Sequence, residues 1–319
     1  MTHSADATIR VGLILFGWVG LFFVARFVNN PGFWVATWVA QGFLFEGMSG
    51  AAHEAGHCKL YKSRGANTAT GWLTSIPRLL NYPAYQLAHM EHHRHTHDPA
   101  ADSEPHYSVM GLLDYLAYMA FSGISYTIIL NWQGVVATLG VGPSWYTTRR
   151  HRRLATLGTV VVVVELAAVS LGAWFAPRTL VTFWLIPFLL YNSIIASLVT
   201  KPEHFGCGDG PDSSLQTTRT TYSNRLFASL LWNNNLHTAH HLVPSLPGNS
   251  LPRLQALIDP HCRHRSRSYT RWHWKTFLQC MKNPRAMSVT TVNLWVSFRN
   301  RQRNSKRLFA RRSRAREAA

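Results

Sequence analysis

The sequence contains the pattern H-x-x-H-H twice, at residues 89–93 and 237–241. On a helix, residues three and four positions apart lie on one face, so each copy presents its imidazoles together. His53 with His57, one helical turn apart, and the single His204 add further imidazoles. Neutral imidazole is the commonest metal ligand of proteins, and no single ion can bind this many. The pattern predicts one site for two metal ions, with candidate ligands His53, His57, His89, His92, His93, His204, His237, His240 and His241.

An all-nitrogen site of this kind favours iron and O2 activation. Zinc has no redox chemistry, whereas two adjacent iron ions bind O2 between them and store two oxidising equivalents. Such an oxidant removes hydrogen from an unactivated C–H bond, which no ordinary side chain can do. A position at a membrane surface would let a lipid-soluble chain reach the site from the bilayer.

A different reading starts from the segment His53-Glu54-Ala55-Gly56-His57. It satisfies H-E-x-x-H, the zinc metalloprotease signature, in which the glutamate is the general base. An intramembrane zinc protease is therefore an alternative, although it leaves both H-x-x-H-H copies without a role. A non-catalytic metal-binding membrane protein is a third hypothesis. We assign no role to His3, His106, His151, His261, His264 and His273, and we expect His95 to be a polar neighbour of its box.

The elements that must position these histidines are membrane helices. The chain is 47% hydrophobic and only 14% charged, with 12 Trp, which is typical of a membrane protein. Apolar runs predict four spans near residues 11–28, 33–52, 154–176 and 180–200. The segment near 109–140 is apolar but is interrupted by polar side chains, and we expect it to lie in the membrane interface. The interruptions are Asp114, Asn131 and Gln133.

Four spans place every histidine cluster and both termini on one side of the membrane. Nearly all Lys and Arg residues fall on that side, and the positive-inside rule then predicts that it is the cytoplasm. Residues 1–260 form the predicted membrane domain, and 261–319 form a basic cytoplasmic tail. Beside four spans, the basic stretch 299–316 indicates an anionic lipid surface and not nucleic acid. The predicted fold is an all-α integral membrane protein with four transmembrane helices and a cytoplasmic helical cap that holds the di-metal site.

The spacing H-x-x-x-H, then H-x-x-H-H twice, with spans between, resembles the membrane-bound fatty acid desaturase and hydroxylase superfamily. The resemblance runs from the second span to Pro252, and the segments 92–99, 203–204 and 240–247 support it. It implies two Fe ions, O2 as co-substrate, and His204 as a ligand. The implied reaction is oxidation of an acyl or alkyl chain, foremost desaturation of a fatty acyl lipid. Hydroxylation or ketolation of a lipid or isoprenoid by the same centre is the alternative.

The resemblance also implies an electron donor. No segment resembles cytochrome b5 or a flavin-binding domain, so we expect electrons from a separate protein of the ferredoxin or cytochrome b5 type. One departure is His97, where many relatives have Asn; it is either an added ligand or a hydrogen-bond partner. Glu46 lies two helical turns before His53 and is either an acceptor for a ligand imidazole or a paired or protonated glutamate. Glu54 is then a partner behind the ligands or is not needed.

Overall fold

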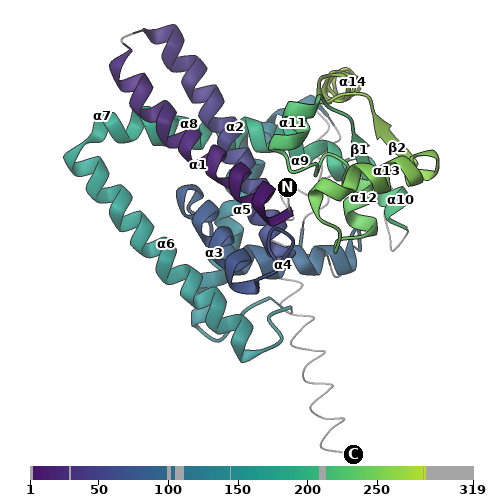
Figure 1. The fold of residues 1–319 in the computed structure, drawn as a ribbon, viewed down its shortest axis with the longest axis horizontal. Coiled ribbons are helices and arrows are strands. Elements are labelled where there is room, and N and C mark those ends of the chain that lie inside the picture. Colours follow the sequence, from purple (N-terminus) through teal and green to yellow (C-terminus); the bar gives the residue numbers. More distant parts are fainter. Residues whose placement is uncertain are drawn as a thin grey trace, which may run out of the picture.

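The structure, a computed structural model, describes residues 3–28, 30–98, 102–104, 111–143, 145–207, 213–282 and 284. The first two helices, α1 (His3–Phe27) and α2 (Pro31–Gly56), form an antiparallel hairpin (Figure 1). The Asn30 side chain accepts a hydrogen bond from the backbone N–H of Phe33 at 3.0 Å, and Pro31 supplies a helical φ at the first position. Because α2 continues unbroken to Gly56, it carries His53 in its last turn and His57 as the residue that caps its end.

A second hairpin pairs α6 (Arg149–Phe175) with a long helical segment that starts at Pro177 and ends at His204. This returning segment consists of α7, α8 and α9, joined by two π-helical turns. Its parts are α7 (Pro177–Leu180), the turn Val181–Leu185, α8 (Ile186–Leu190), the turn Tyr191–Ile195 and α9 (Ala196–His204). In Figure 1 both hairpins extend to the left, away from the small C-terminal helices.

Four helices are long and apolar enough to cross a membrane: Ser4–Phe27, Leu112–Thr138, Arg149–Phe175 and Pro177–His204. Their outer faces expose large apolar side chains such as Phe16 and Val164, which suits contact with lipid. Three of the four correspond to predicted spans. The fourth is α5 (Leu112–Thr138), which the sequence placed in the interface, while the predicted span 33–52 lies in the less apolar α2. The number of spans therefore stays a prediction.

Helix α5 runs between two elements that lead to the histidines. In its first half, Ser122 Oγ lies 2.6 Å from Ser197 Oγ of α9, whose last residue is His204. Near its end, Asn131 Nδ2 donates to the carbonyl of Leu79 at 2.8 Å, just before α4 (Tyr82–His95). These contacts fix α5 against the elements that carry the histidines, and its interfacial placement stays a prediction.

Helices α3 (Arg64–Ser75) and α4 form a helical hairpin through the 3₁₀ turn Ile76–Arg78. The two helices approach closely at Gly71, where a Cβ atom would lie 2.0 Å from Cζ of Tyr82. Asn81 caps α4 by accepting from the N–H of Ala84, and its Nδ2 donates to the Ala155 carbonyl of α6 at 2.9 Å. This buried asparagine thus fixes the start of α4 against α6.

After α9 the chain forms a compact group of short elements, on the right in Figure 1. The strands β1 (Arg219–Thr221) and β2 (His264–Ser266) pair in parallel, and Thr220 also bridges to Leu236, the residue before α12 (His237–Leu242). The other elements are α10 (Ser214–Thr217), α11 (Arg225–Leu230), a 3₁₀ turn Gly248–Ser250, α13 (Leu251–Ile258), a 3₁₀ turn Asp259–His261 and α14 (Tyr269–Met281).

Helix α14 is held against the rest of the protein by a buried histidine. His273 Nε2 donates to the Leu198 carbonyl at 2.9 Å, and its Nδ1 accepts from the Tyr115 hydroxyl at 2.8 Å. Folded structure therefore continues beyond the predicted boundary at residue 260. The basic stretch 299–316 lies outside the described residues, so the tail stays a prediction.

Candidate metal centre

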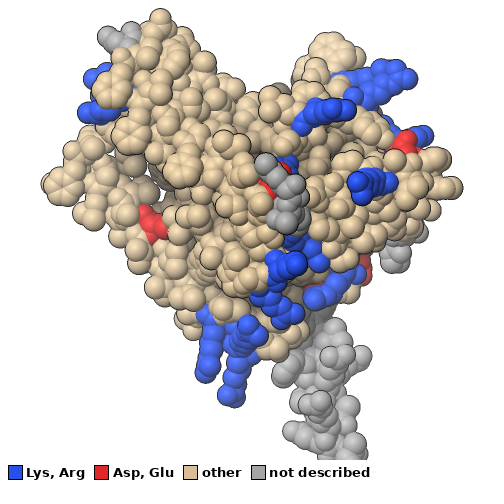
Figure 2. All heavy atoms as spheres, in the orientation of Figure 1, with Lys and Arg blue, Asp and Glu red and all other residues tan. Residues whose placement is uncertain are grey.

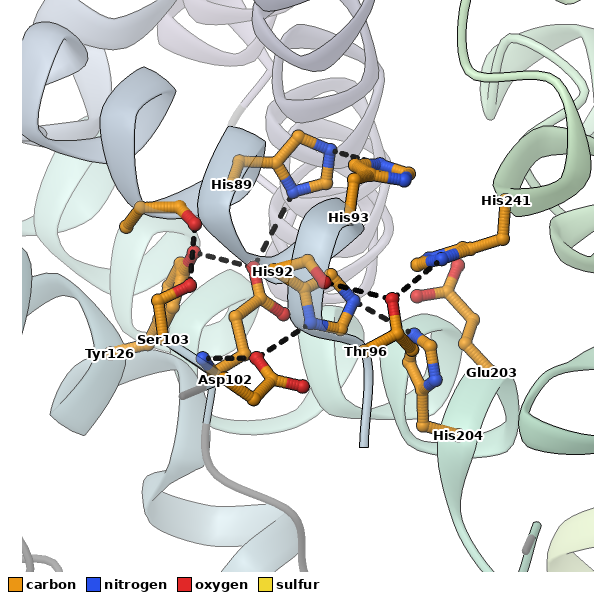
Figure 3. A network of polar contacts seen from close by, with 12 residues as sticks. His89, His92, His93, Thr96, Asp102, Ser103, Tyr126, Glu203, His204 and His241 are labelled. Atoms are coloured by element: carbon orange, nitrogen blue, oxygen red, sulfur yellow. Dashed lines mark hydrogen bonds and ion pairs between the residues drawn. The ribbon is translucent and has the colours of Figure 1, made fainter. Parts of the chain in front are cut away.

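The ends of four helices bring all nine predicted histidines into one buried cluster, part of which Figure 3 shows. Helix α2 supplies two of them, α4 three, α9 one at its last residue, and α12 three. These helix ends are far apart in the sequence, and only the fold brings them together. The cluster therefore depends on the packing of α2, α4, α9 and α12.

Five imidazoles form the first subsite. One nitrogen of each lies within 4.8 Å of the others, and the members are His53, His57, His89, His93 and His240. The Nε2 atoms make the closest approaches. His89 Nε2 lies 3.0 Å from Nε2 of both His57 and His93, and His240 Nε2 lies 3.0 Å from that of His93. The Nε2 lone pairs thus point at a shared centre.

Four imidazoles form the second subsite. His92, His204 and His241 meet the same 4.8 Å criterion, and His237 joins them because its Nε2 lies 2.9 Å from Nε2 of His204. His92 Nε2 lies 3.2 Å from the same His204 atom. The rings of His93 and His241 stack with centroids 4.2 Å apart, so the two subsites are immediate neighbours.

Each H-x-x-H-H copy is divided between the two subsites. On α4 the i, i+4 pair His89 and His93 enters the first subsite, and the intervening His92 enters the second. On α12 the division is reversed, with His237 and His241 in the second subsite and His240 in the first. Adjacent residues on a helix point about 100° apart. The doubled histidine therefore lets one short helix serve two metal ions.

The donor atoms suit metal ions. Burial lowers the pKa of His89, His93, His240 and His241 well below the ordinary value, so these rings are neutral and hold free lone pairs. Among the described residues, Nε2 of His53 and Nε2 of His241 are buried without a hydrogen-bond partner. Acceptors lie behind Nδ1 of His92 and of His204, so where both protons sit on Nδ1 the two Nε2 lone pairs face each other at 3.2 Å, which is unfavourable unless a cation lies between them. The residues present therefore fit a pair of metal ions.

Carboxylates lie behind the imidazoles, on the Nδ1 side. Asp102 Oδ1 lies 2.9 Å from His92 Nδ1 (Figure 3). Glu104 Oε1 lies 3.4 Å from His89 Nδ1. Two longer contacts of this kind join Glu203 to His237 at 3.5 Å and Glu54 to His53 at 3.6 Å. An acceptor at Nδ1 fixes the proton there and leaves Nε2 for the metal. Burial lowers the pKa of His92, but Glu104 and Asp102 outweigh it and raise it to about 9, so a metal ion that binds Nε2 displaces a proton from this ring.

Two hydroxyl groups complete this outer layer. Thr96 donates to the His92 carbonyl at 2.8 Å and lies 3.2 Å from His241 Nδ1, from which it accepts. Tyr126 of α5 donates to Glu104 at 3.0 Å. The sequence analysis missed Thr96, Asp102, Glu104 and Tyr126. The acidic residues that follow the box at 89–93 in the sequence were the available signal, because ligating histidines usually have carboxylate partners.

The position of Glu54 argues against a zinc protease. Its Oε2 accepts from the backbone N–H of Gly248 at 2.9 Å, and its Oε1 faces Nδ1 of His53. A general base in H-E-x-x-H must face the metal-bound water on the Nε2 side. This carboxylate instead lies behind a candidate ligand and is engaged by the backbone.

The structure also shows where the other residues singled out in the sequence lie. His97 lies behind the second subsite, with its Nε2 3.1 Å from Nδ1 of His204, so it does not face the centre as a ligand would. Glu46 has Arg78 as its charged neighbour, and the carboxylate at Nδ1 of His53 is Glu54 instead. His95 contacts Glu91 at 3.4 Å, as expected of a polar neighbour.

Comparison with known proteins gives a consistent family. The family model described as fatty acid desaturase matches residues 32–273. The chloroplastic omega-3 fatty acid desaturase of Glycine max is 23% identical over 252 residues, 72% of this chain and 54% of that protein. The sn-2 acyl-lipid omega-3 desaturase (ferredoxin) of Helianthus annuus is 23% identical over 253 residues, 72% of this chain and 56% of its own length.

A shorter match has higher identity. The Delta(12) fatty acid desaturase of Mortierella alpina is 33% identical over 63 residues, 20% of this chain and 16% of that protein. At most, the chain spans about half the length of these curated relatives.

Proposed function

Because the chain belongs to the fatty acid desaturase family, we propose that it is a membrane-bound di-iron oxidoreductase that introduces a double bond into a fatty acyl lipid. The reaction would take two hydrogens from adjacent carbons of the chain. It would consume O2, two electrons and two protons, and release two molecules of water. The names of the matched relatives support an acyl substrate.

The observation that carries this proposal is the pair of adjacent all-histidine subsites. A zinc site normally holds four ligands, and catalytic zinc keeps only three from the protein. Five imidazoles at one centre exceed the four ligands of a zinc site, and four at the next exceed the three protein ligands of a catalytic zinc; both sets suit iron in neighbouring octahedral sites. Two iron ions held there would supply the oxidising power, drawn from O2, that C–H cleavage requires.

The chain's own residues would orient and insulate this centre. Asp102 and Glu104 hold protons on Nδ1 of His92 and His89, so that both rings present Nε2 inward. Tyr85 stacks on the His89 ring with centroids 5.5 Å apart and excludes water from that side. Because α2 and α9 leave the apolar region at the histidines, an acyl chain can approach along these helices without leaving the bilayer.

The centre and both termini would face the cytoplasm. In Figure 2 the flank of the two hairpins is largely free of charge, whereas Lys and Arg side chains gather below the start of α6 and on the right-hand part. Arg149, Arg152 and Arg153 line a cavity of about 330 Å³ where α5 meets α6. Positive charge at the end of an apolar helix favours the cytoplasmic side and its anionic lipids.

Electrons would come from a separate one-electron carrier. The Helianthus relative carries ferredoxin in its name, which supports a donor of that type. A cytochrome b5-type donor is the alternative. Supplying each reduced carrier to the purified protein and measuring product formed per chain distinguishes the two.

Iron content and product identity test the proposal. Protein purified in mild detergent is expected to hold close to two irons per chain by elemental analysis. Lipids of a host expressing it should gain an unsaturated acyl chain by mass spectrometry, and a host expressing His93→Ala should not. A hydroxylated or ketone product would replace desaturation by the alternative reaction of the same centre. One zinc and no iron would refute the oxidoreductase proposal.

A further inference from the structure

We infer that His97 is a positioning residue that fixes the ring of His204 and thereby holds the second metal ion. The inference rests on the proposed function, since it assumes that the second subsite binds iron. It starts from a series of hydrogen bonds that links His92 and His204, two candidate ligands of this subsite, on their Nδ1 sides. This chain of hydrogen bonds runs through His97 and Asp102, which follow α4 in the sequence.

The first half of this chain passes through Asp102, which is fully buried. Its Oδ1 accepts from Nδ1 of His92 at 2.9 Å, and its Oδ2 accepts from the backbone N–H of His97 at 2.8 Å. One carboxylate therefore sets both the ring of a candidate ligand and the backbone of His97. This arrangement leaves Nε2 of His92 directed at the second subsite.

The second half passes through the side chain of His97, of which only 3% is exposed. Its Nε2 lies 3.1 Å from Nδ1 of His204, and the Thr217 carbonyl lies 3.3 Å from the same atom. A carbonyl can only accept, so Nδ1 of His204 carries the proton and Nε2 keeps its lone pair. His97 Nε2 is then an acceptor, and His97 acts on the metal through His204.

His204 needs such a partner more than the other ligands do. It is the last residue of α9, so the helix gives its ring no support from a following turn. No second candidate ligand lies near it in sequence, whereas the boxes at 89–93 and 237–241 supply neighbours. His97 itself has a left-handed φ of 63°, a conformation that costs free energy in most residues. Asn tolerates this conformation, so His97→Asn is a conservative variant for the backbone.

The experiment compares His97→Leu with His97→Asn, His97→Gln and the matched control His95→Leu. The full chain is purified without metal, titrated with Fe²⁺ under anaerobic conditions, and examined by elemental analysis and ⁵⁷Fe Mössbauer spectroscopy. Loss of a group behind a ligand typically lowers metal affinity about 10–100-fold. We expect His97→Leu to retain about one iron per chain, with one of the two spectral components lost. His97→Asn and His97→Gln keep an acceptor and should recover the second iron, and His95→Leu should keep both.

The outcomes separate this inference from the proposed function. A parent protein that does not bind two irons would refute the proposed function itself. If the parent binds two irons and a folded His97→Leu protein also binds two with an unchanged spectrum, only the role of His97 is refuted. If His97→Leu does not fold, the folded His97→Asn and His97→Gln proteins provide the test. If these variants lose the second iron as fully as expected for His97→Leu, a hydrogen-bond acceptor at this position does not hold that iron, and the role of His97 is refuted.

Discussion

The two subsites of the histidine cluster differ in how many imidazoles they contain and in how those imidazoles are held. The first has five imidazoles, but among the described residues Nδ1 of His93 and of His240 are buried without a hydrogen-bond partner. The second has four imidazoles, and Nδ1 of three of them has a hydrogen-bond partner: Asp102 for His92, His97 for His204 and Thr96 for His241. Nδ1 of the fourth, His237, has only an ion-pair contact with Glu203 at 3.5 Å.

The difference suggests that ligand number and ligand orientation compensate for each other. Ligands from neighbouring turns of α2 and α4 support one another in the first subsite, because the helices hold them at i, i+4 spacing. The second subsite has only one such pair, His237 and His241 of α12, and takes His92 and His204 singly, so it relies more on hydrogen bonds to orient its rings. It should therefore be the more sensitive of the two to changes behind its ligands.

The largest effect is expected from removing a ligand. His204→Ala and His89→Ala should each lower product formation about a thousandfold or more, because the two metals act as one unit and such losses do not add. Their metal contents should differ. His204→Ala leaves three imidazoles and should lose the second iron, whereas His89→Ala leaves four in the first subsite and should retain more than one iron per chain.

His261→Ala, which changes an exposed histidine outside the cluster, is the control and should keep full activity and metal. Elemental analysis and product formation per chain are measured on the same samples. Equal iron loss in both ligand variants would remove the distinction between the subsites.

A smaller effect is expected from the carboxylates. Asp102 accepts three hydrogen bonds, from His92, from the N–H of His97 and from the N–H of Glu104. Asp102→Asn places an amide N–H₂ group against at least one of these donors, so Fe²⁺ affinity of the second subsite should fall about 10–100-fold. Glu104→Gln should cost less, because the contact with His89 is 3.4 Å and the Glu104 side chain is 27% exposed.

Anaerobic Fe²⁺ titrations of the two variants, beside the parent protein, measure this difference. A Glu104→Gln variant that loses iron more completely than Asp102→Asn would reverse the proposed order of the subsites.

The sequence identified the histidines of the cluster better than the layer behind them. Imidazoles at i, i+3 and i+4 share a helix face whatever the tertiary fold, so the boxes at 89–93 and 237–241 were recognisable. Which subsite each ring enters depends on how α4 and α12 meet, and no local pattern records that. Asp102 and Glu104 lie in an irregular segment without periodicity, so only their charge marked them.

The same distinction applies to the membrane helices. Uniformly apolar runs such as 154–176 were predicted within a few residues of α6. Helices α2 and α5 mix apolar and polar residues, because each has one face against the cluster or the helices that carry it. Mean hydropathy alone therefore does not decide which of them crosses the bilayer.

The smallest effect is expected at Glu54, which belongs to the first subsite. Its Oε2 accepts from the Gly248 N–H at 2.9 Å, and its contact with His53 Nδ1 is 3.6 Å. Glu54→Gln keeps an oxygen for Gly248 and loses only the weak acceptor behind His53, one ligand of five. Both irons should remain, and product formed per iron should fall less than about tenfold, below the range for a group that fixes a ligand. A general base of a zinc protease would instead cost about a hundredfold or more.

Product formed per iron, with reductant and O2 in excess, is therefore measured for Glu54→Gln beside Glu91→Gln. Glu91 pairs with Arg94 and His95 on the exposed side of α4, so the control changes a glutamate of a box helix that faces no ligand. A Glu54→Gln protein with full iron and no product would mean that this carboxylate takes part in the chemistry. The first subsite would then depend on the group behind its ligand as strongly as the second, and the compensation between ligand number and orientation would not hold.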